Sequence, residues 1–410
     1  MRIAILSSEK PENACARVRL RDVIKYLQPD VSFTWTGIEE AGAVDATDIL
    51  KSADVVVVQR SFPRPRTMKM LQAALFESGK PVIYETDDLL TDLPTSHPEY
   101  ATYARHRHLT LSCIANCDAV IVSTEVLKAR HVPLNPRVYV FGNTLDKSSW
   151  QRPRPQQHGR SGRGPLTIGF CGSHTHVPDL EGIEVALERI QAHYGDRVRF
   201  SFFGCTTERL KRLPNLTYRE GFISYSDYPA LLQSLQLDIG LAPLMNNEFN
   251  ANKSHIKYLE YAACGIPGIY SDLAPYKASV THGRTGLLVG DTTDAWYEAI
   301  VQLIEQPDLS ERIAMAAYED VWARFATEAK APDWLAIARA TLEDFHSSSS
   351  AIPRSRSAMA QAMWELAVDY EQRLAEDEAA LAQAQQRIDW LERRPLERAL
   401  QTAKGVFLNR

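Results

Sequence analysis

The sequence lacks the features that mark several large classes of protein. It has no apolar run of about 18 residues, so we expect no membrane-spanning helix. Its opening stretch, MRIAILSSEK, has too short an apolar part for a signal peptide, and we expect a buried strand and a polar turn there. The net charge is only −5, so the overall charge does not favour nucleic acid or an anionic membrane as a partner. We therefore expect a cytoplasmic chain with no nucleic-acid partner.

Two kinds of site are missing as well. The six cysteines form no Cys-x-x-Cys pair, and Cys113 and Cys117 lie in a helical-looking stretch without nearby histidines. No set of four convergent nitrogen or sulfur ligands is evident, so we expect scattered reduced thiols and no metal site. No Gly-x-Gly-x-x-Gly follows the first apolar run, in ILSSEKPENA, which argues against a dinucleotide-dependent enzyme. The remainder is typical of a globular protein, with 45% hydrophobic and 24% charged residues. A length of 410 residues favours two or three domains.

The first part of the chain alternates short apolar runs with stretches of helical spacing. Runs such as VVVV are apolar on both faces, as strands are when helices cover both sides of a parallel sheet. The alternation predicts a doubly wound α/β domain, Rossmann-like, over residues 1–150. The expected strands span residues 3–6, 31–35, 54–59, 81–85, 119–123 and 138–141.

A second domain of the same class follows. Residues 151–165 are rich in Pro, Gly, Arg and Gln, which predicts a linker, and the α/β pattern then resumes over 166–330. We expect a closing helix at 331–346. The expected strands span residues 166–170, 198–204, 216–220, 237–244, 267–271 and 285–290.

The end of the chain has a different composition. Residues 347–357 are rich in Ser and predict a second linker, and residues 358–410 carry apolar side chains at 3-4 spacing, which predicts a long helix. This helix could associate with a second copy as a coiled coil or fold back onto the body. Its end places Leu396, Leu400 and Phe407 among Arg and Lys, which also suits peripheral contact with the inner face of a membrane.

The first candidate site lies at the start of the second domain. IGFCGSHTH is a strand that ends in a turn at Gly172 and Ser173, and a helix, PDLEGIEVALERI, comes next. Glycine lets the backbone approach a ligand, and the first turn of a helix offers free N–H groups, so the turn suits a diphosphate. The alternative is a tight turn that uses glycine for steric reasons alone.

The second candidate site is FNANKSHIKYLEYAACGIPGIYSD, residues 249–272. On a helix that starts near Ser254, the cation of Lys253 and the free N–H groups could hold a phosphate together. Glu260 could accept hydrogen bonds from a ribose diol, and Lys257 lies three residues before it. The alternative is a surface helix with a Lys–Glu pair.

Four segments in this order and spacing resemble the donor-binding half of glycosyltransferase family 4, the group 1 glycosyl transferases. They are GFCGSHTHVPDLE, EGFISYSDYPALLQSLQLDIGLAPL, KSHIKYLEYAACGIPGIYSD and HGRTGLLVGD. The first half resembles the family in PVIYETDDLL, DAVIVSTEVLK and VFGNTLD, so the resemblance covers about residues 1–345. It implies the GT-B fold, in which two Rossmann-like domains face a cleft.

The resemblance also implies roles on the donor side. Glu260 matches the second glutamate of the family's Glu-x7-Glu motif and would hold the ribose, whereas the first glutamate falls at Asn252. Asn252, Asn250 and Glu248 are the candidates to replace its contact with the sugar. The Arg and Lys that clamp the diphosphate in other members are not evident, so His174, His176 and Lys253 are the local substitutes.

On the acceptor side, the resemblance points to Arg17 and Arg19 after the first strand and to Asp87 and Asp88 after PVIYE, where many members carry a histidine. Two adjacent carboxylates suit sugar or acceptor hydroxyls; alternatively they bind a hard cation, or Asp88 caps the next turn. Because GT-B enzymes usually work without a bound metal, the resemblance implies no metal and no other cofactor.

We therefore expect a retaining glycosyltransferase that uses a nucleotide-diphosphate sugar and a saccharide, lipid-linked or other hydroxyl acceptor, in the synthesis of cell-surface polysaccharide or glycoconjugates. The second domain would stabilise the leaving phosphate through Lys253 and N–H groups, and the first would position the acceptor through Asp87 and Asp88. The alternative is a catalytically weak or inactive protein of the same fold that binds sugars or nucleotides or acts in assembly.

Overall fold

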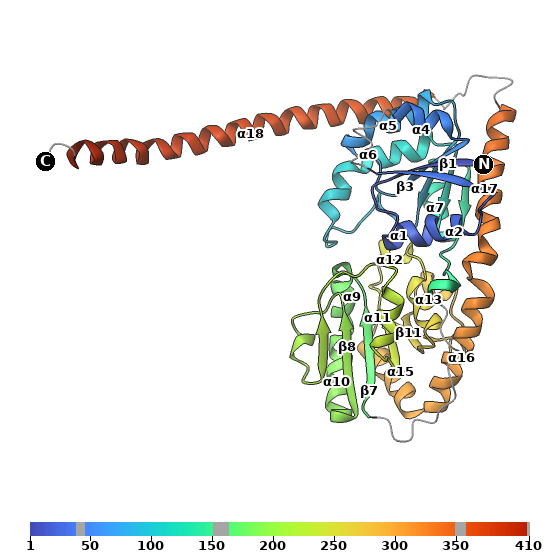
Figure 1. Cartoon of the computed structure of the whole chain (residues 1–410). Coiled ribbons are helices and arrows are strands. Elements are labelled where there is room, and N and C mark those ends of the chain that lie inside the picture. Colours follow the sequence, from blue (N-terminus) through green and yellow to red (C-terminus); the bar gives the residue numbers. More distant parts are fainter. Residues whose placement is uncertain (38–45, 151–163, 349–357, 408–410) are drawn as a thin grey trace. The chain divides into compact units, whose positions relative to one another are not determined.

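The computed structural model describes residues 1–37, 46–150, 164–348 and 358–407. It contains two six-stranded parallel sheets, one after the other along the chain (Figure 1). All twelve expected strands are present, each within two residues of its expected ends. They are β1 (Arg2–Ser7), β2 (Ser32–Thr36), β3 (Val55–Gln59), β4 (Val82–Thr86), β5 (Ala119–Val122), β6 (Val138–Val140), β7 (Leu166–Cys171), β8 (Val198–Phe203), β9 (Leu216–Arg219), β10 (Ile239–Ala242), β11 (Gly268–Ser271) and β12 (Leu287–Val289).

Helices connect the strands and cover the sheets. In the first domain they are α1 (Ala14–Ala16), α2 (Asp22–Lys25), α4 (Ala46–Ser52), α5 (Met68–Gln72), α6 (Tyr100–Asn116), α7 (Glu125–His131) and α8 (Lys147–Trp150), with π-helical turns η1 (Arg17–Arg21) and η3 (Ala73–Glu77) and the 3-10 turn η2 (Pro65–Thr67). The second domain has α9 (Val177–Glu181), α10 (Glu184–Tyr194), α11 (Tyr228–Ser234), α12 (Glu248–Ala251), α13 (Ile256–Ala263), α14 (Ala274–Lys277), α15 (Thr293–Glu305) and α16 (Pro307–Arg324), with 3-10 turns η4 (His174–His176), η5 (Gly195–Arg197) and η6 (Leu210–Arg212). Two long helices, α17 (Thr327–Ser348) and α18 (Ala358–Phe407), end the chain.

The first sheet has the strand order β2-β1-β3-β4-β5-β6. Every residue of β3 is buried, which explains its continuous apolar run. The order in which the chain adds strands to the sheet reverses between β1 and β3. These two parallel strands pair along their length, from Ile3 opposite Val55 to Ser7 opposite Gln59. The loops that follow these two strands diverge there, and such a point is where open α/β sheets bind ligands.

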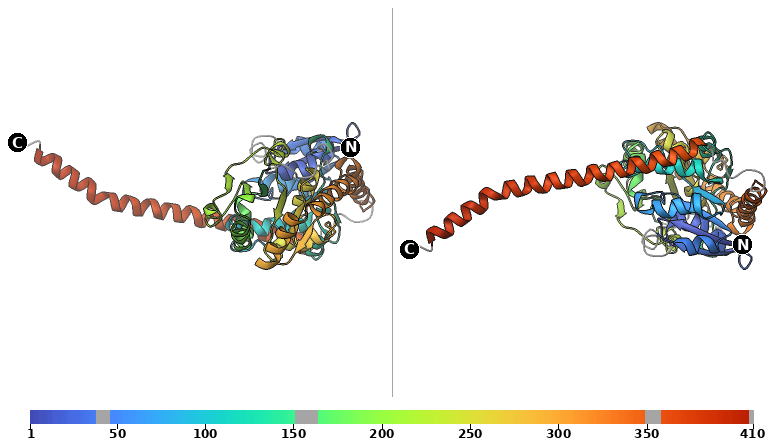
Figure 2. Two further views of the ribbon diagram at one scale, coloured as in Figure 1. Left: turned by 90° about the horizontal axis from the view of Figure 1, so that it is seen from below. Right: turned by 90° about the horizontal axis from the view of Figure 1, so that it is seen from above.

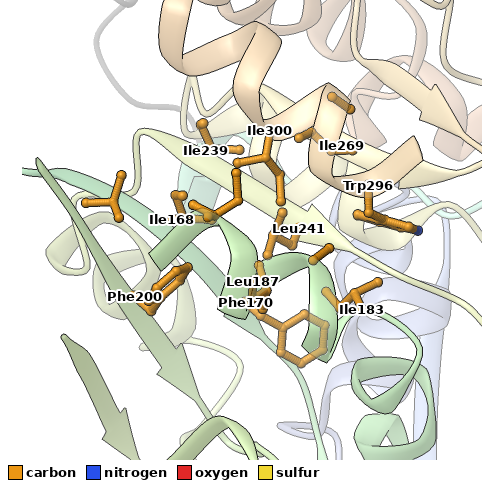
Figure 3. Close-up of a cluster of buried hydrophobic side chains, with 14 of the residues drawn as sticks. Ile168, Phe170, Ile183, Leu187, Phe200, Ile239, Leu241, Ile269, Trp296 and Ile300 are labelled. Atoms are coloured by element: carbon orange, nitrogen blue, oxygen red, sulfur yellow. The ribbon is translucent and has the colours of Figure 1, made fainter. Parts of the chain in front are cut away.

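The second sheet has the order β12-β11-β10-β7-β8-β9, and its reversal point lies between β7 and β10. Its core joins strand residues such as Ile168, Phe200 and Leu241 to Leu187 of α10 and Trp296 of α15 (Figure 3). A Cβ on Gly169 would lie 2.3 Å from Leu237 Cδ2, so only glycine fits in this central strand. The packing fixes the end of β7, where the first candidate site begins.

The chain returns to the first domain after α16. The N–H of Leu145 donates to the carbonyl of Phe325 at 2.9 Å, and the N–H of Thr327 donates to that of Leu145 at 3.0 Å. Helix α17 then packs against α2, and Trp334 and Ala338 join the core of the first domain (Figure 1). The closing helix expected at 331–346 lies inside α17. Most of the expected linker 151–165 and of the linker 347–357 falls outside the described residues.

By its contacts the chain divides into two compact units, residues Met1–Arg354 and Ser355–Arg410. The described part of the second unit, residues 358–407, is one continuous helix, α18 (Figure 2), as expected for the tail. Leu366, Tyr370 and Leu381 are exposed on it, whereas the side chains of Leu396, Leu400 and Phe407 lie outside the described part. Among the described helices, none is both long and apolar enough to cross a membrane.

Candidate functional site

A cavity of about 340 Å³ lies between the carboxyl ends of the two sheets. We call it the central cavity. The loops that follow β1, β3 and β4 line it from one side, and those that follow β7 and β10, together with the start of α13, line it from the other. This is where two facing α/β domains are expected to bind a ligand. Candidate residues on its wall are Asp87, Asp88, Gly172, Ser173, His176, Lys253, Ser254, Lys257 and Glu260.

The turn after β7 is held by close backbone packing. The N–H of Gly172 donates to the carbonyl of Phe203 at 3.1 Å, and a Cβ on Gly172 would lie 2.6 Å from the Phe170 ring. Gly204 faces the same turn with a φ of +88°, and a Cβ there would lie 2.2 Å from the Gly172 oxygen. Ser173 follows, with its Oγ 2.7 Å from Thr175 Oγ1. Bulkier residues would push the two turns apart, so these glycines keep the backbone close to the cavity.

Glu260 lies at the centre of a small polar cluster. It is only 3% exposed, and its Oε2 accepts hydrogen bonds from Lys257 Nζ at 2.8 Å and from the Tyr228 hydroxyl at 3.2 Å. Glu260 and Lys257 also line a second cavity of about 510 Å³, which extends to residues 220–223 and to His174. We call it the side cavity. The predicted Lys257–Glu260 pair therefore exists, but it faces two cavities and is not a surface pair.

Lys253 and Ser254 stand at the junction of the two domains. Lys253 is half-buried, with its Nζ 5.0 Å from the centre of the Phe249 ring, and no carboxylate pairs with it among the described residues. Ser254 Oγ accepts a hydrogen bond from Asn143 Nδ2 of the first domain at 2.7 Å. An ammonium group without a counter-ion on a cavity wall is available to an anionic ligand.

The structure does not bring Arg17 or Arg19 to the central cavity. Arg19 is fully buried and binds Glu85 Oε1 at 2.6 Å and Asn143 Oδ1 at 2.8 Å, so it supports the contact to Ser254 from behind. Arg17 forms an ion pair with Asp22 at 3.1 Å. Both residues belong to the π-helical turn η1, which places Val18, between them, on the cavity wall together with Ala14 and Cys15 of α1.

None of the three candidates for the missing glutamate reaches the central cavity either. Asn252 is buried and donates to the Glu248 carbonyl at 2.8 Å, and Asn250 donates to Asp179 Oδ1 at 2.9 Å. Glu248 is exposed and pairs with Arg130 at 2.7 Å. Their side chains serve the local structure around α12, so none of them is placed to make the sugar contact that the resemblance implies for this motif position.

Asp87 and Asp88 line the cavity, but they are not free carboxylates. Arg60 Nη1 forms an ion pair with Asp87 Oδ1 and lies 3.3 Å from Asp88 Oδ2. Its Nε is 3.3 Å from Glu9 Oε1. Arg60 directly follows β3 and has a φ of 45°, a left-handed conformation that costs a non-glycine residue about 1–3 kcal/mol. The backbone thus turns the guanidinium to a position between the carboxylates.

Sequence reasoning missed Arg60. The available signal was its position, directly after the fully buried strand β3, which pairs with β1 at the reversal point. Cys15, His97 and Tyr103 also line the cavity and were not predicted. Burial raises the pKa of Cys15 to about 12, so it stays a thiol at neutral pH and is not a thiolate nucleophile. Burial and the charge of Lys253 lower the pKa of His97.

Comparisons with known proteins agree with this geometry. Residues 165–306 match the sequence model of the family described as glycosyl transferases group 1. No curated protein matches the sequence significantly. Among solved structures, the HepE protein of Anabaena in complex with UDP and glucose is 15% identical, with a TM-score of 0.60, covering 85% of this chain and 100% of that chain.

Two further structures have the same architecture. Sucrose-phosphate synthase of Thermosynechococcus elongatus is 13% identical with a TM-score of 0.60, covering 84% of this chain and 100% of that chain. An α-glucosyltransferase in complex with UDP and a DNA that contains an HMU base is 12% identical with a TM-score of 0.58, covering 83% of this chain and 99% of that chain. Together with the two parallel sheets, these matches confirm the GT-B fold predicted from the sequence.

Proposed function

We propose that this chain, which has the GT-B fold and whose residues 165–306 match the group 1 glycosyl transferases, transfers a sugar from a nucleotide diphosphate to a hydroxyl acceptor with retention of configuration. One observation carries the proposal. Glu260 and Lys253 of the second domain line the same cavity as the Arg60–Asp87 pair of the first. Donor groups and acceptor groups thus face one space.

On the donor side, the ribose would bind at Glu260. Both of its hydrogen bonds end on Oε2, and Oε1 has no partner among the described residues, so it can accept from a hydroxyl. The base would extend into the side cavity toward Phe222, whose side chain is 89% exposed. The diphosphate would lie over Gly172 and Ser173, within reach of the Lys253 cation.

Lys253 would also stabilise the charge that develops on the leaving diphosphate. A positive charge at this place supplies what a metal ion supplies in other transferases, so the proposal includes no metal or other cofactor. No carboxylate partner competes for Lys253 among the described residues, which keeps its charge available to the phosphate.

On the acceptor side, Asp88 is the better candidate to accept a hydrogen bond from the attacking hydroxyl. Its side chain is 26% exposed, compared with 10% for Asp87, and it lies farther from Arg60 Nη1. Glu9, Asp87 and Asp88 surround one guanidinium, so this side of the cavity carries a net negative charge. A neutral saccharide hydroxyl fits such a wall better than a phosphate-bearing group does. We propose the synthesis of polysaccharide or glycoconjugates in the cytoplasm as its setting.

The test begins with UDP-, GDP- and dTDP-sugars screened by thermal shift. A donor that binds only the folded state adds about 2.7 kcal/mol at a hundredfold excess over its dissociation constant. Release of nucleotide diphosphate is then measured with a panel of saccharide acceptors, and the anomeric configuration of the product is read by NMR. We expect one nucleotide class to bind and the product to keep the donor configuration. An inverted product would refute retention, and the absence of binding by all donors would refute the donor site.

The alternative, a binding protein without activity, has one observation in its favour, namely the absence of the first glutamate at Asn252. Donor binding without nucleotide release, whichever acceptor is supplied, would favour it.

A further inference from the structure

Asn252 is not among the residues that line the central cavity, so it is not placed to make the sugar contact that the resemblance implies for this position. On the wall of that cavity, beside the Gly172 turn, lies His176. A Cβ on Gly172 would be 3.1 Å from His176 Cδ2, the ring carbon bonded to Nε2. The ring carbon next to Nε2 therefore borders the turn over which the diphosphate would lie.

The other nitrogen of this ring is fixed by a buried carboxylate. His176 Nδ1 is 2.8 Å from Asp179 Oδ2. Asp179 is 5% exposed, and its Oδ1 accepts from the N–H of Met245 at 2.7 Å and from Asn250 Nδ2 at 2.9 Å. Burial opposes ionisation of Asp179, but the bond from His176, the charge of Lys253 and the Met245 N–H keep its pKa below the ordinary value. An ionised carboxylate only accepts, so the proton of the neutral imidazole is on Nδ1 and Nε2 carries the lone pair.

The charges around His176 keep it neutral. Burial, with the charges of Lys253 and Lys257 in addition, lowers its pKa to about 4, although Asp179 acts in the opposite direction. At neutral pH the ring therefore presents an acceptor to the cavity. Phosphate oxygens are acceptors as well, so a neutral Nε2 cannot bind them, which argues against the role in the diphosphate clamp predicted from the sequence. A sugar hydroxyl can donate to it.

We propose that His176, oriented by Asp179, accepts a hydrogen bond from a hydroxyl of the donor sugar and so replaces the carboxylate that the chain lacks at Asn252. The proposal rests on the proposed function. His176 is then a specificity-determining residue, since a donor whose hydroxyl is missing or differently placed loses this bond. Asp179 is a positioning residue, which acts through His176 and through the loop at Met245.

The test compares a nucleotide with its nucleotide sugar by calorimetry, using UDP and UDP-glucose, or GDP and GDP-mannose if the screen selects guanine. His176→Phe keeps an aromatic ring against Phe170, whose centre is 5.8 Å away, but removes Nε2. We expect unchanged affinity for the nucleotide and a three- to tenfold loss for the nucleotide sugar. His193→Phe is the matched control. His193 is an exposed residue of α10 that contacts Tyr297 of α15, so its substitution should change neither the affinity for the nucleotide nor that for the nucleotide sugar.

A second measurement separates positioning from structure. Monodeoxyfluoro versions of the sugar cannot donate a hydrogen bond at the replaced hydroxyl. We expect one of these fluorosugars to bind the wild type more weakly than the parent nucleotide sugar does. His176→Phe should bind this fluorosugar and the parent with equal affinity. In Asp179→Asn, the amide donates to Nδ1 and moves the ring proton to Nε2, so the same fluorosugar should lose its disadvantage there too.

Equal loss of nucleotide and nucleotide sugar in His176→Phe would overturn the inference, because the side chain would then act on the phosphates or on the structure alone. Fluorosugar discrimination that persists in both variants would overturn it as well, while the proposed donor site would stand. A wild type that binds no nucleotide at all would refute the proposed function itself.

Discussion

His255 gives the sharpest prediction about stability. It lies beside Ser254 at the junction of the two domains, is 7% exposed and has its ring centre 4.8 Å from that of Phe325. Its Nε2 is buried and has no hydrogen-bond partner among the described residues. Burial, with the charges of Arg324 and Arg19 in addition, lowers its pKa from 6.5 to about 4.

The sign of the effect follows from this pKa. In the unfolded chain His255 takes up a proton below pH 6.5, whereas in the folded protein it stays neutral until about pH 4. Stability is therefore lost as the pH falls through this window, because the unfolded state binds more protons. With about 1.4 kcal/mol for each pKa unit, the loss reaches about 3 kcal/mol below pH 4, of which about 2 kcal/mol has occurred at pH 5.

The perturbation is His255→Phe, which fills the site with a ring and removes both the titration and the unsatisfied nitrogen. We expect the variant to be at least as stable as the wild type at pH 7 and to lose about 2 kcal/mol less between pH 7 and pH 5. Urea unfolding followed by tryptophan fluorescence at both values measures this. His193→Phe, at an exposed ring, should keep the wild-type pH dependence. If His255→Phe loses as much stability in acid as the wild type does, His255 is not buried as a neutral group and the reasoning fails.

Three further predictions concern the site and the tail. Lys253→Ala and Glu260→Gln should each weaken nucleotide binding by about 1.5–3 kcal/mol, measured by calorimetry, and unchanged affinity in both would remove the donor site. Gln is chosen because its amide oxygen can still accept a hydrogen bond from Lys257, which is 13% exposed, whereas Ala would remove this acceptor and destabilise the fold further. Asp88→Asn should reduce turnover at least tenfold with donor affinity intact, and a larger effect from Asp87→Asn would reverse their proposed roles. Deletion of residues 350–410 should leave donor affinity unchanged. If the tail self-associates, the deletion should also reduce the molecular mass in light scattering from that of a dimer to that of a monomer. Lost donor affinity would show that the tail belongs to the catalytic body.

The strands could be predicted from the sequence because a strand that is buried on both faces consists mostly of apolar residues. VVVVQ is apolar at nearly every position because both faces of β3 are covered, and the same reasoning located the ends of β7 and β10. Gly172 and Glu260, two of the candidate site residues, lie on the wall of the central cavity. Gly172 must be glycine because of its neighbours, and Glu260 follows from the motif and faces the cavity.

The direction of side chains in the loops could not be predicted in this way. Arg19 and Asn252 occupy the expected positions along the chain, but one packs behind the cavity and the other against its own helix. Arg60 reaches its place through a left-handed backbone conformation, which no periodicity reveals. Such orientations depend on a few dihedral angles and on partners distant in the sequence, including Glu85 for Arg19.

The return of the chain at Leu145 and Thr327 has a consequence for biosynthesis. Trp334 is fully buried in the core of the first domain, and Ala331 and Ala338 join it there, although all three are encoded after the whole of the second domain. Domains generally fold in the order in which the ribosome releases them. Here the first domain emerges early, but one side of its core is not covered until α17 has left the ribosome. Its apolar surface there therefore stays exposed while the whole second domain is synthesised. A nascent chain stalled before residue 327 would lack the helix that completes the core of the first domain.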